Sequence, residues 1–239
     1  MDSIKGRSLH SQAESAREQQ QNFIKSLQLL DEAIIAYEKD GDLRGLSEAL
    51  QSRSSANKHL FQSTGDKVFL TIAKHEALAG VEIAESLNDP SALTMVYRGL
   101  AKILEQFKDW VGASEYFEKS IEAFKKTPPK ENNRPAVISD LKAHFAYSLY
   151  KSGNKAKGLE VMNIALLELE KDKLETKYNR DVWLSGAHMR AGEMLIKDDS
   201  DLSKKHLKMA KVIIESNSDL KLRAMQLKEL EKRLKLLIG

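Results

Sequence analysis

The sequence predicts an all-α protein: about five antiparallel helix hairpins, stacked as a right-handed superhelix (solenoid) and followed by a C-terminal capping helix. Two observations carry this prediction. Apolar residues recur three and four positions apart along almost the whole chain, which is the period of an amphipathic helix. Proline, which breaks helices most reliably, occurs at only 4 of the 239 positions, and three of these lie in the segment 127–135.

The expected helices are separated by residues that favour turns. Asp89 precedes Pro90, which places a helix-capping residue before a proline at the first helical position. The segment 8–39 forms either one long helix or two helices that separate near residues 19–22. We expect one domain over residues 1–239, with residues 1–10 disordered, a surface loop at 127–135 and a capping helix at 218–239. The other turn signals are Gly41-Asp42, Gly65-Asp66, Lys108-Asp109, Gly153-Asn154 and Asp198-Asp199-Ser200.

A row of four residues, in which small and large side chains alternate at spacings of four, three and four, recurs five times. Small residues occupy the first and third positions of every row, and large apolar residues fill the others in every row but the second. Helices approach one another closely only where the side chains at the crossing are small, so the rows predict close crossings in a repeated hairpin. The rows begin at Ser26, Ala73, Ala113, Gly158 and Ser203.

Two hairpins resemble the tetratricopeptide repeat (TPR). The match is looser around Asn57 and Lys58, which stand where a large and a small residue are expected, and the repeats are longer than the usual 34 residues. A long-helix variant of the family and a HEAT-like array are therefore both open. The resemblance implies a superhelix that binds a segment of a partner protein and has no chemistry of its own. The matching residues are Tyr97, Leu100, Ala101, Leu104, Ala113, Phe117 and Ser120 in one hairpin, and Phe145, Ala146, Leu149, Gly158, Met162 and Ala165 in the other.

The sequence holds no recognisable catalytic or metal-binding motif. It has no cysteine, which excludes disulfides, thiolate catalysis and Cys-based zinc sites. His75-Glu76 begins like a zinc-protease motif, but Ala79 stands where the second histidine is required. The segment 153–158 is glycine-flanked like a phosphate loop, yet Leu159 and Glu160 follow it in place of Lys and Ser or Thr. We therefore expect no enzyme, no metal and no cofactor.

Partner-binding residues are expected on the first helix of each hairpin, at positions that do not pack within the hairpin. These positions combine cations with tyrosines. Such a mixture suits an acidic segment, because arginine donates paired hydrogen bonds to carboxylates and tyrosine offers rigid contact area. We expect an interaction scaffold or adaptor that binds a peptide or helix, acidic by preference, in a concave groove. A regulatory sensor of a peptide signal and an all-α enzyme are the alternatives. The candidate residues are Arg53, Lys58, Arg98, Lys102, Tyr147, Tyr150 and His188.

The C-terminal segment is a second candidate surface. From Lys204 to Gly239 ten Lys and Arg residues stand against four acidic ones, and Leu227, Leu230, Leu234 and Leu237 follow a heptad-like spacing. This helix caps the last hairpin, forms a homodimer, or docks on an anionic surface; we favour the cap. Nucleic acid is disfavoured because the net charge is only +3 and no aromatic residue interleaves with these cations. The lack of a long apolar run predicts no membrane span and no secretory signal, and hence a cytoplasmic protein.

Overall fold

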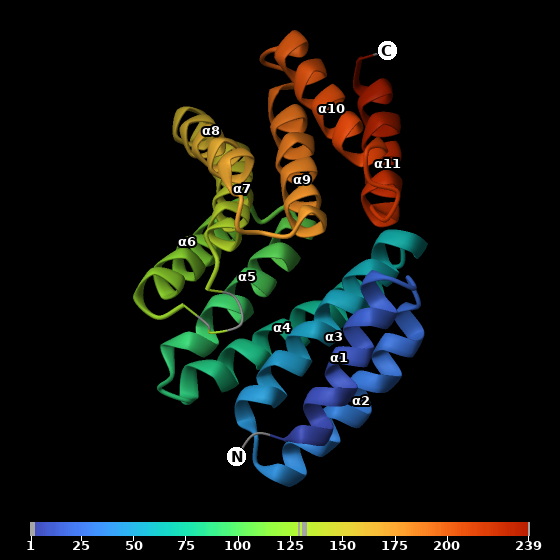
Figure 1. Cartoon of the computed structure of the whole chain (residues 1–239), viewed down its shortest axis with the longest axis vertical. Coiled ribbons are helices and arrows are strands. Elements are labelled where there is room, and N and C mark those ends of the chain that lie inside the picture. Colours follow the sequence, from blue (N-terminus) through green and yellow to red (C-terminus); the bar gives the residue numbers. More distant parts are fainter. Residues whose placement is uncertain (1–2, 129, 131–132, 239) are drawn as a thin grey trace. The chain divides into compact units, whose positions relative to one another are not determined.

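The computed structural model describes residues 3–128, 130 and 133–238, and gives only the backbone of Arg233 and of residues 236–238. The described residues form eleven α-helices and no strand, which confirms the prediction of an all-α protein (Figure 1). The helices are α1 (Ile4–Glu18), α2 (Phe23–Asp40), α3 (Leu43–Thr64), α4 (Lys67–Ser86), α5 (Pro90–Gln106), α6 (Trp110–Lys126), α7 (Pro135–Lys151), α8 (Lys155–Lys171), α9 (Lys177–Leu195), α10 (Ser200–Glu215) and α11 (Lys221–Ile238).

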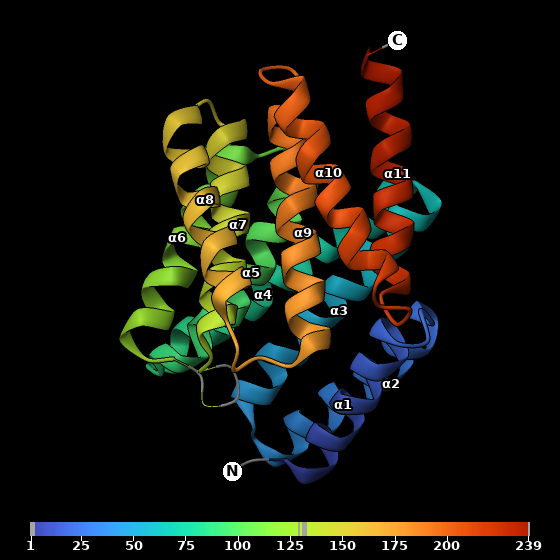
Figure 2. The same cartoon turned by 45° about the horizontal axis from the view of Figure 1, so that its top comes forward.

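The chain divides into two compact units where we expected a single domain. Unit 1 comprises residues 1–129, with the hairpins α1/α2, α3/α4 and α5/α6; unit 2 comprises residues 130–239, with α7/α8, α9/α10 and α11. The boundary falls inside the proline-containing segment 127–135, part of which lies outside the described residues. The predicted five hairpins and a last helix are all present (Figure 2).

The N-terminal residues form a helix rather than the disordered tail we expected. Residues 4–10 are the first turns of α1, so that prediction is wrong for every residue of the segment that the structure describes. The Ser3 Oγ accepts a hydrogen bond from the Gly6 N–H at 3.0 Å, and the Ser3 N–H donates to Asp42 at 3.0 Å. These two bonds cap α1 and fix its start to the α2–α3 turn. The segment 8–39 is two helices, because α1 ends at Glu18 and Asn22 caps α2.

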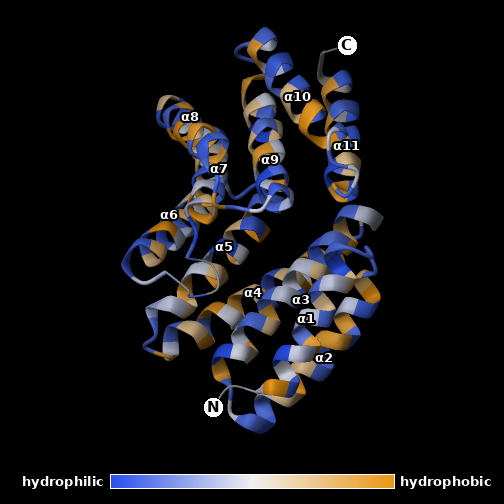
Figure 3. Ribbon diagram, in the orientation of Figure 1, coloured by the Kyte–Doolittle hydropathy of each residue, from blue (hydrophilic) through white to orange (hydrophobic). Residues whose placement is uncertain are grey.

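The five alternating rows lie on the second helix of each hairpin, and their small residues mark close crossings as predicted. The Ser120 Oγ donates to the Thr94 carbonyl across the α5/α6 hairpin at 2.7 Å, and the Ser203 Oγ donates to the Gly192 carbonyl across α9/α10 at 2.7 Å. Distances this short require the two helix backbones to be close, which a larger side chain would prevent. Figure 3 shows apolar and polar residues alternating along each helix, the pattern of amphipathic helices packed on one side.

The last helix, α11, covers the end of unit 2. Its Leu227, Leu230 and Leu234 are 3–5% exposed and pack with Met189 of α9 and Ile214 of α10 in one apolar cluster. The alternative of a homodimer through this leucine row finds no support at these three residues, because their side chains are already buried within unit 2. The side chain of Leu237 lies outside the described residues.

Candidate partner-binding surface

In unit 1 the first helices α1, α3 and α5 lie next to one another, with α3 between the other two. On α3, Arg44, Gln51 and Lys58 are seven residues apart and so share one side of the helix. All three are near α5: the Arg44 Nη1 donates to Ser91 at 3.0 Å, and the Gln51 side chain packs directly on Gly99. We call the surface formed by this side of α1, α3 and α5 the first-helix face of unit 1.

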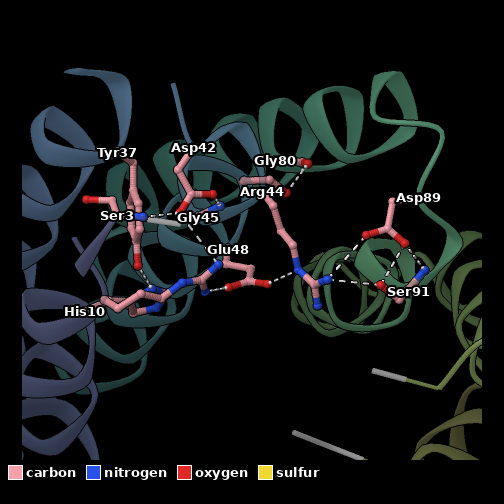
Figure 4. A network of polar contacts seen from close by, with 12 residues as sticks. Ser3, His10, Tyr37, Asp42, Arg44, Gly45, Glu48, Gly80, Asp89 and Ser91 are labelled. Carbon is pink, nitrogen blue, oxygen red and sulfur yellow. Dashed lines mark hydrogen bonds and ion pairs between the residues drawn. The ribbon is translucent and has the colours of Figure 1, made fainter. Parts of the chain in front are cut away.

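At one end of the first-helix face, alternating charges connect the three helices (Figure 4). Arg7 of α1 pairs with Glu48 of α3, and the same carboxylate accepts a hydrogen bond from the Arg44 Nε at 3.0 Å. Arg44 reaches on to Asp89, the capping residue of α5, at 3.3 Å. The Arg7 guanidinium also lies 5.5 Å from the centre of the Tyr37 ring. The arginines at this end are thus engaged by carboxylates of the protein itself.

Next along the face, a histidine and a serine form the kind of hydrogen bond that activates a serine nucleophile in enzymes. The His10 Nε2 is 2.7 Å from the Ser52 Oγ, and the Tyr37 hydroxyl is 3.4 Å from the His10 Nδ1. Burial lowers the pKa of His10, so its imidazole is neutral near pH 7. Ser52, however, lies in the middle of α3, where the backbone N–H groups bond within the helix and cannot stabilise an oxyanion. The pair connects α1 to α3, and we assign it no catalytic role.

At the other end of the face lies Lys58, one of the predicted partner-binding residues. Lys58 is half-buried and forms no hydrogen bond or ion pair with any residue that the structure describes. Burial lowers the pKa of its ammonium to about 8; the charges of Arg17 and Arg98 lower it further, while those of Glu18 and Glu105 oppose the shift. Lys58 therefore lies between α1 and α5 with its charge uncompensated at short range.

Arg98 and Lys102 of α5 are, like Lys58, predicted partner-binding residues. Arg98 is near enough to Lys58 to influence its pKa, and Lys102 follows Arg98 by one helical turn on the same side of α5. Our sequence reasoning missed Arg17 and Glu18, which form an ion pair at 2.8 Å beside Lys58, because α1 carries no part of the repeat pattern.

Arg53 does not join this group. It pairs with Asp31 of α2 and, at 3.0 Å, with Glu76 of α4, so its guanidinium is directed toward the second helices. The neighbouring Asn57 donates to the same Glu76 at 2.9 Å. Arg53 thus helps to hold α3 against α2 and α4, away from the side of α3 that carries Lys58.

The three candidate partner-binding residues in unit 2 are buried rather than exposed. Tyr147, Tyr150 and His188 are 8%, 6% and 4% exposed. The Tyr150 hydroxyl donates to Asp198, and burial together with this bond raises the pKa of Tyr150 to about 12. The His188 Nδ1 is 3.0 Å from the Nδ1 of His206 on α10. Tyr150 and His188 therefore join helices within unit 2, and all three side chains are packed inside it.

Unit 2 also has an open pocket that the sequence did not predict. Its volume is about 400 Å³, and it lies where α8 packs on α9 less extensively than the corresponding helices of unit 1 pack on each other. Its lining combines apolar side chains with Lys155, Asp198 and His206. No pattern within a single helix encodes the angle between hairpins, so no sequence signal could have revealed it. The apolar lining includes Leu159, Met162, Ala191, Leu195 and Leu202.

In the described part of the chain, no three His, Asp or Glu side chains come together in a way that could hold a metal ion. Likewise, none of the helices so described combines the length and the apolar character needed to cross a membrane.

Several solved structures are similar to this chain, and they are TPR-like repeat proteins. BtubC (BKLC) from P. vanneervenii matches with a TM-score of 0.51 and 14% identity, over 89% of this chain and 90% of its own. A kinesin light chain of Podosopora anserina with nearly identical TPR-like repeats matches with a TM-score of 0.54 and 16% identity, over 88% and 96%. A point variant of that protein gives 0.55 and 16%, over 88% and 94%.

These similarities show that the chain has a TPR-like helical-repeat fold, as the resemblance of two hairpins predicted. At this level of identity they show the fold alone. No protein family's sequence profile matches the chain, and no curated protein matches it.

Proposed function

We propose that this protein is an interaction scaffold without catalysis of its own, and that the first-helix face of unit 1 binds a peptide or helix of a partner protein. An acidic side chain of that partner contacts Lys58. The observation that carries this proposal is the half-buried ammonium of Lys58, which has no carboxylate within ion-pair distance among the described residues. Partly burying an uncompensated charge is unfavourable, and a partner's carboxylate would supply the missing compensation.

The surroundings of Lys58 favour an acidic group there rather than along the whole face. Arg7, Arg17 and Arg44 are already paired with carboxylates of the protein, so they add little net positive charge. The partner is therefore expected to need one well-placed acidic residue and not an acidic run. Arg98 and Lys102, on the adjacent helix, would contact the residues next to it.

The fold supports binding of an extended segment. A stack of helix hairpins offers a long surface that is formed before the partner arrives, so the protein itself loses little freedom on binding. The ion pairs from Arg7 to Glu48 and from Arg44 to Asp89 hold α1, α3 and α5 in register, which stiffens this surface further.

Affinity capture from a native lysate tests the proposal. The wild-type chain is compared with Lys58→Glu and with Lys125→Glu, a matched charge reversal at an exposed position of α6 in the same unit. A protein retained by the wild type and by Lys125→Glu, but lost with Lys58→Glu, would support the proposal. Retention by all three would show that Lys58 makes no such contact.

A second pair of changes tests the extent of the surface. Arg98→Ala combined with Lys102→Ala is expected to weaken the affinity for the captured partner, because Arg98 lies near Lys58 and Lys102 is one turn further along the same helix. Unchanged affinity would limit the binding surface to α1 and α3.

A further inference from the structure

We propose that the pocket of unit 2 binds an uncharged aromatic small molecule that carries an O–H or N–H donor, and that the Nε2 of His206 accepts a hydrogen bond from this donor. The site lies between the hairpins α7/α8 and α9/α10 and is independent of the partner-binding surface proposed for unit 1. Three observations support it: the lining of the pocket, the compensation of its charges, and a row of polar contacts that ends at His206.

The size and lining of the pocket are those of a small-molecule site. Its volume of about 400 Å³ falls in the usual range of such sites, roughly 300–1,000 Å³. Three of its lining residues belong to the core of unit 2, since Met162, Ala191 and Leu195 are only 1–4% exposed. A small molecule reaches side chains buried this deeply more readily than a protein surface does. The thioether of Met162 also favours contact with an aromatic ring.

The charged groups of the described lining are compensated within the protein. The Lys155 Nζ lies 2.8 and 2.7 Å from the two carboxylate oxygens of Asp198, and the Tyr150 hydroxyl donates to the same carboxylate. These contacts join the end of α7 and the start of α8 to the α9–α10 turn. Asp199 caps α10 and accepts a hydrogen bond from the Leu202 N–H at 2.9 Å. The lining therefore favours an uncharged ligand, because a charged one would lose its hydration without gaining a partner of opposite sign.

Two histidines beside the pocket are hydrogen-bonded to each other. The Nδ1 atoms of His188 on α9 and His206 on α10 are 3.0 Å apart, and the centres of the two rings are 5.3 Å apart. Ring centres so far apart require the two nitrogens to point at each other, as in a linear hydrogen bond. Burial lowers the pKa of both histidines, so both rings are neutral near pH 7. One ring therefore carries its proton on Nδ1 and donates, and the other accepts.

A carboxylate determines which of the two rings donates. The buried Nε2 of His188 has no hydrogen-bond partner among the described residues, and the Glu170 Oε1 lies 3.9 Å from it. A negative charge at this distance favours a proton on that nitrogen, so the His188 Nδ1 is the acceptor of the pair. His206 then donates from its Nδ1, and its own Nε2 carries a lone pair.

This lone pair is available to a ligand in the pocket. His206 is half-buried and lines the pocket, and its Nε2 lies on the part of the ring directed away from His188. The atom is not buried and has no hydrogen-bond partner among the described residues. An acceptor at the side of an apolar pocket selects a ligand with a donor, because a ligand without one would cover the lone pair and leave it unsatisfied.

Binding of indole, compared with 1-methylindole, tests the proposal. Both molecules have the same uncharged aromatic body, but 1-methylindole lacks the N–H donor. We expect the full chain to bind indole about fivefold more tightly, the effect of one hydrogen bond. NMR titration of the chain with methyl-labelled methionine measures both affinities: the signal of Met162 should shift, and that of the exposed Met225 on α11 should not. An unshifted Met162 signal, or equal affinities, would overturn the proposal.

Two pairs of variants locate the ligand. Leu159→Trp should fill the pocket and abolish indole binding, whereas Leu167→Trp, at an exposed position two turns further along α8, should not. His206→Phe should bind the two indoles equally, whereas Asn163→Ala, at another polar residue of the lining, should keep the fivefold preference. Indole binding by Leu159→Trp, or a preference that persists in His206→Phe, would overturn the assignment. Circular dichroism checks that each variant is folded, and the comparison of ligands on the wild type depends on no variant.

Capture from a native lysate distinguishes a small molecule from an aromatic side chain of a partner protein. A small-molecule site predicts that Leu159→Trp and the control Leu167→Trp retain every protein that the wild type retains. A protein lost with Leu159→Trp alone would show that a partner's side chain fills the pocket, and the small-molecule assignment would be wrong. Because Lys58 lies in unit 1, the result with Lys58→Glu tests the scaffold function separately.

Discussion

Replacing Gly158 with alanine tests the close crossing of α7 and α8 on which the repeat depends. A Cβ built on Gly158 would lie 2.8 Å from the carbonyl oxygen of Ala146, and 2.9 Å from the backbone nitrogen and the Cβ of Tyr150. Ordinary contacts of a Cβ begin near 3.4 Å, so the two helices would have to separate by about half an ångström. A change of rotamer cannot relieve the contact, because two of the three atoms belong to the backbone of α7.

Two effects of opposite sign decide the outcome. Alanine is favoured over glycine inside a helix by about 1 kcal/mol. Overpacking a close crossing costs about 1–3 kcal/mol. Since the obstructing atoms are backbone, the cost should lie in the upper part of that range, and Met162 and Leu169 of the same row would lose packing as α8 moves. We expect a net loss of about 1–2 kcal/mol, which for a chain of this size lowers the melting temperature by a few degrees.

Chemical and thermal unfolding of the full chain measure this effect, with Asn163→Ala as the control. Asn163 is an exposed residue of the same helix, so its replacement reports helix propensity alone and should raise stability by a few tenths of a kcal/mol. If Gly158→Ala also raised stability, α7 and α8 would not cross as closely as the distances around Gly158 indicate. The interpretation of the alternating rows as marks of close helix crossings would then be wrong.

Three further changes have outcomes of known sign. Gln51→Met should raise the free energy of unfolding by about 1 kcal/mol, because both amide atoms of Gln51 are buried without a described partner and methionine has a similar shape; a lower denaturation midpoint would contradict this. His188→Gln should flatten the loss of stability with acid. Burial and the charge of the neighbouring histidine lower the pKa of His188 to about 4, so in the wild type the unfolded chain takes up a proton between about pH 6.5 and 4 and the folded chain does not. This effect is absent above pH 6.5 and amounts to about 3 kcal/mol at pH 4; equal pH dependence in both proteins would refute it. Asp42→Ala should lower the free energy of unfolding by about 1–2 kcal/mol and speed amide hydrogen exchange at Gly45 and Ser3, because Asp42 accepts hydrogen bonds from their N–H groups at 2.7 and 3.0 Å. Unchanged exchange would show that the cap is dispensable.

The hairpins could be predicted from the sequence because the rule that sets them is local. A crossing is close where small residues recur at helical spacing, and that spacing is visible in a single helix. Ser120 and Gly158 were identified in this way, and both lie at crossings where a larger side chain would meet the backbone or neighbouring side chains of the partner helix. The two units were not predicted, because a division depends on how many contacts cross the segment 127–135 and not on the pattern within any helix.

The binding residues were harder to predict, because a first helix packs against its own second helix and also against the first helices beside it. Periodicity reveals only the strongest of these contacts. Tyr147 and His188 fall outside the main apolar stripe, yet neighbouring helices bury both of them. Arg53 was assigned to the binding surface for the same reason, since the carboxylates of Asp31 and Glu76 that engage it come from helices elsewhere in the sequence.

Lys58 could be singled out from the sequence, because it is a lysine at a position of the repeat where a small residue is expected. It occupies a position at which the better-matching hairpins carry Ala101 and Ala146, and both alanines are fully buried. A lysine at such a position keeps its stem among neighbouring helices while its ammonium is only partly hydrated, and this partial burial is the main cause of its lowered pKa. Asn57 beside it breaks the pattern too, but its amide is satisfied by Glu76. A departure from the repeat is therefore a reason to propose a binding residue only where the structure leaves the polar group uncompensated, and of these two residues Lys58 alone meets that condition.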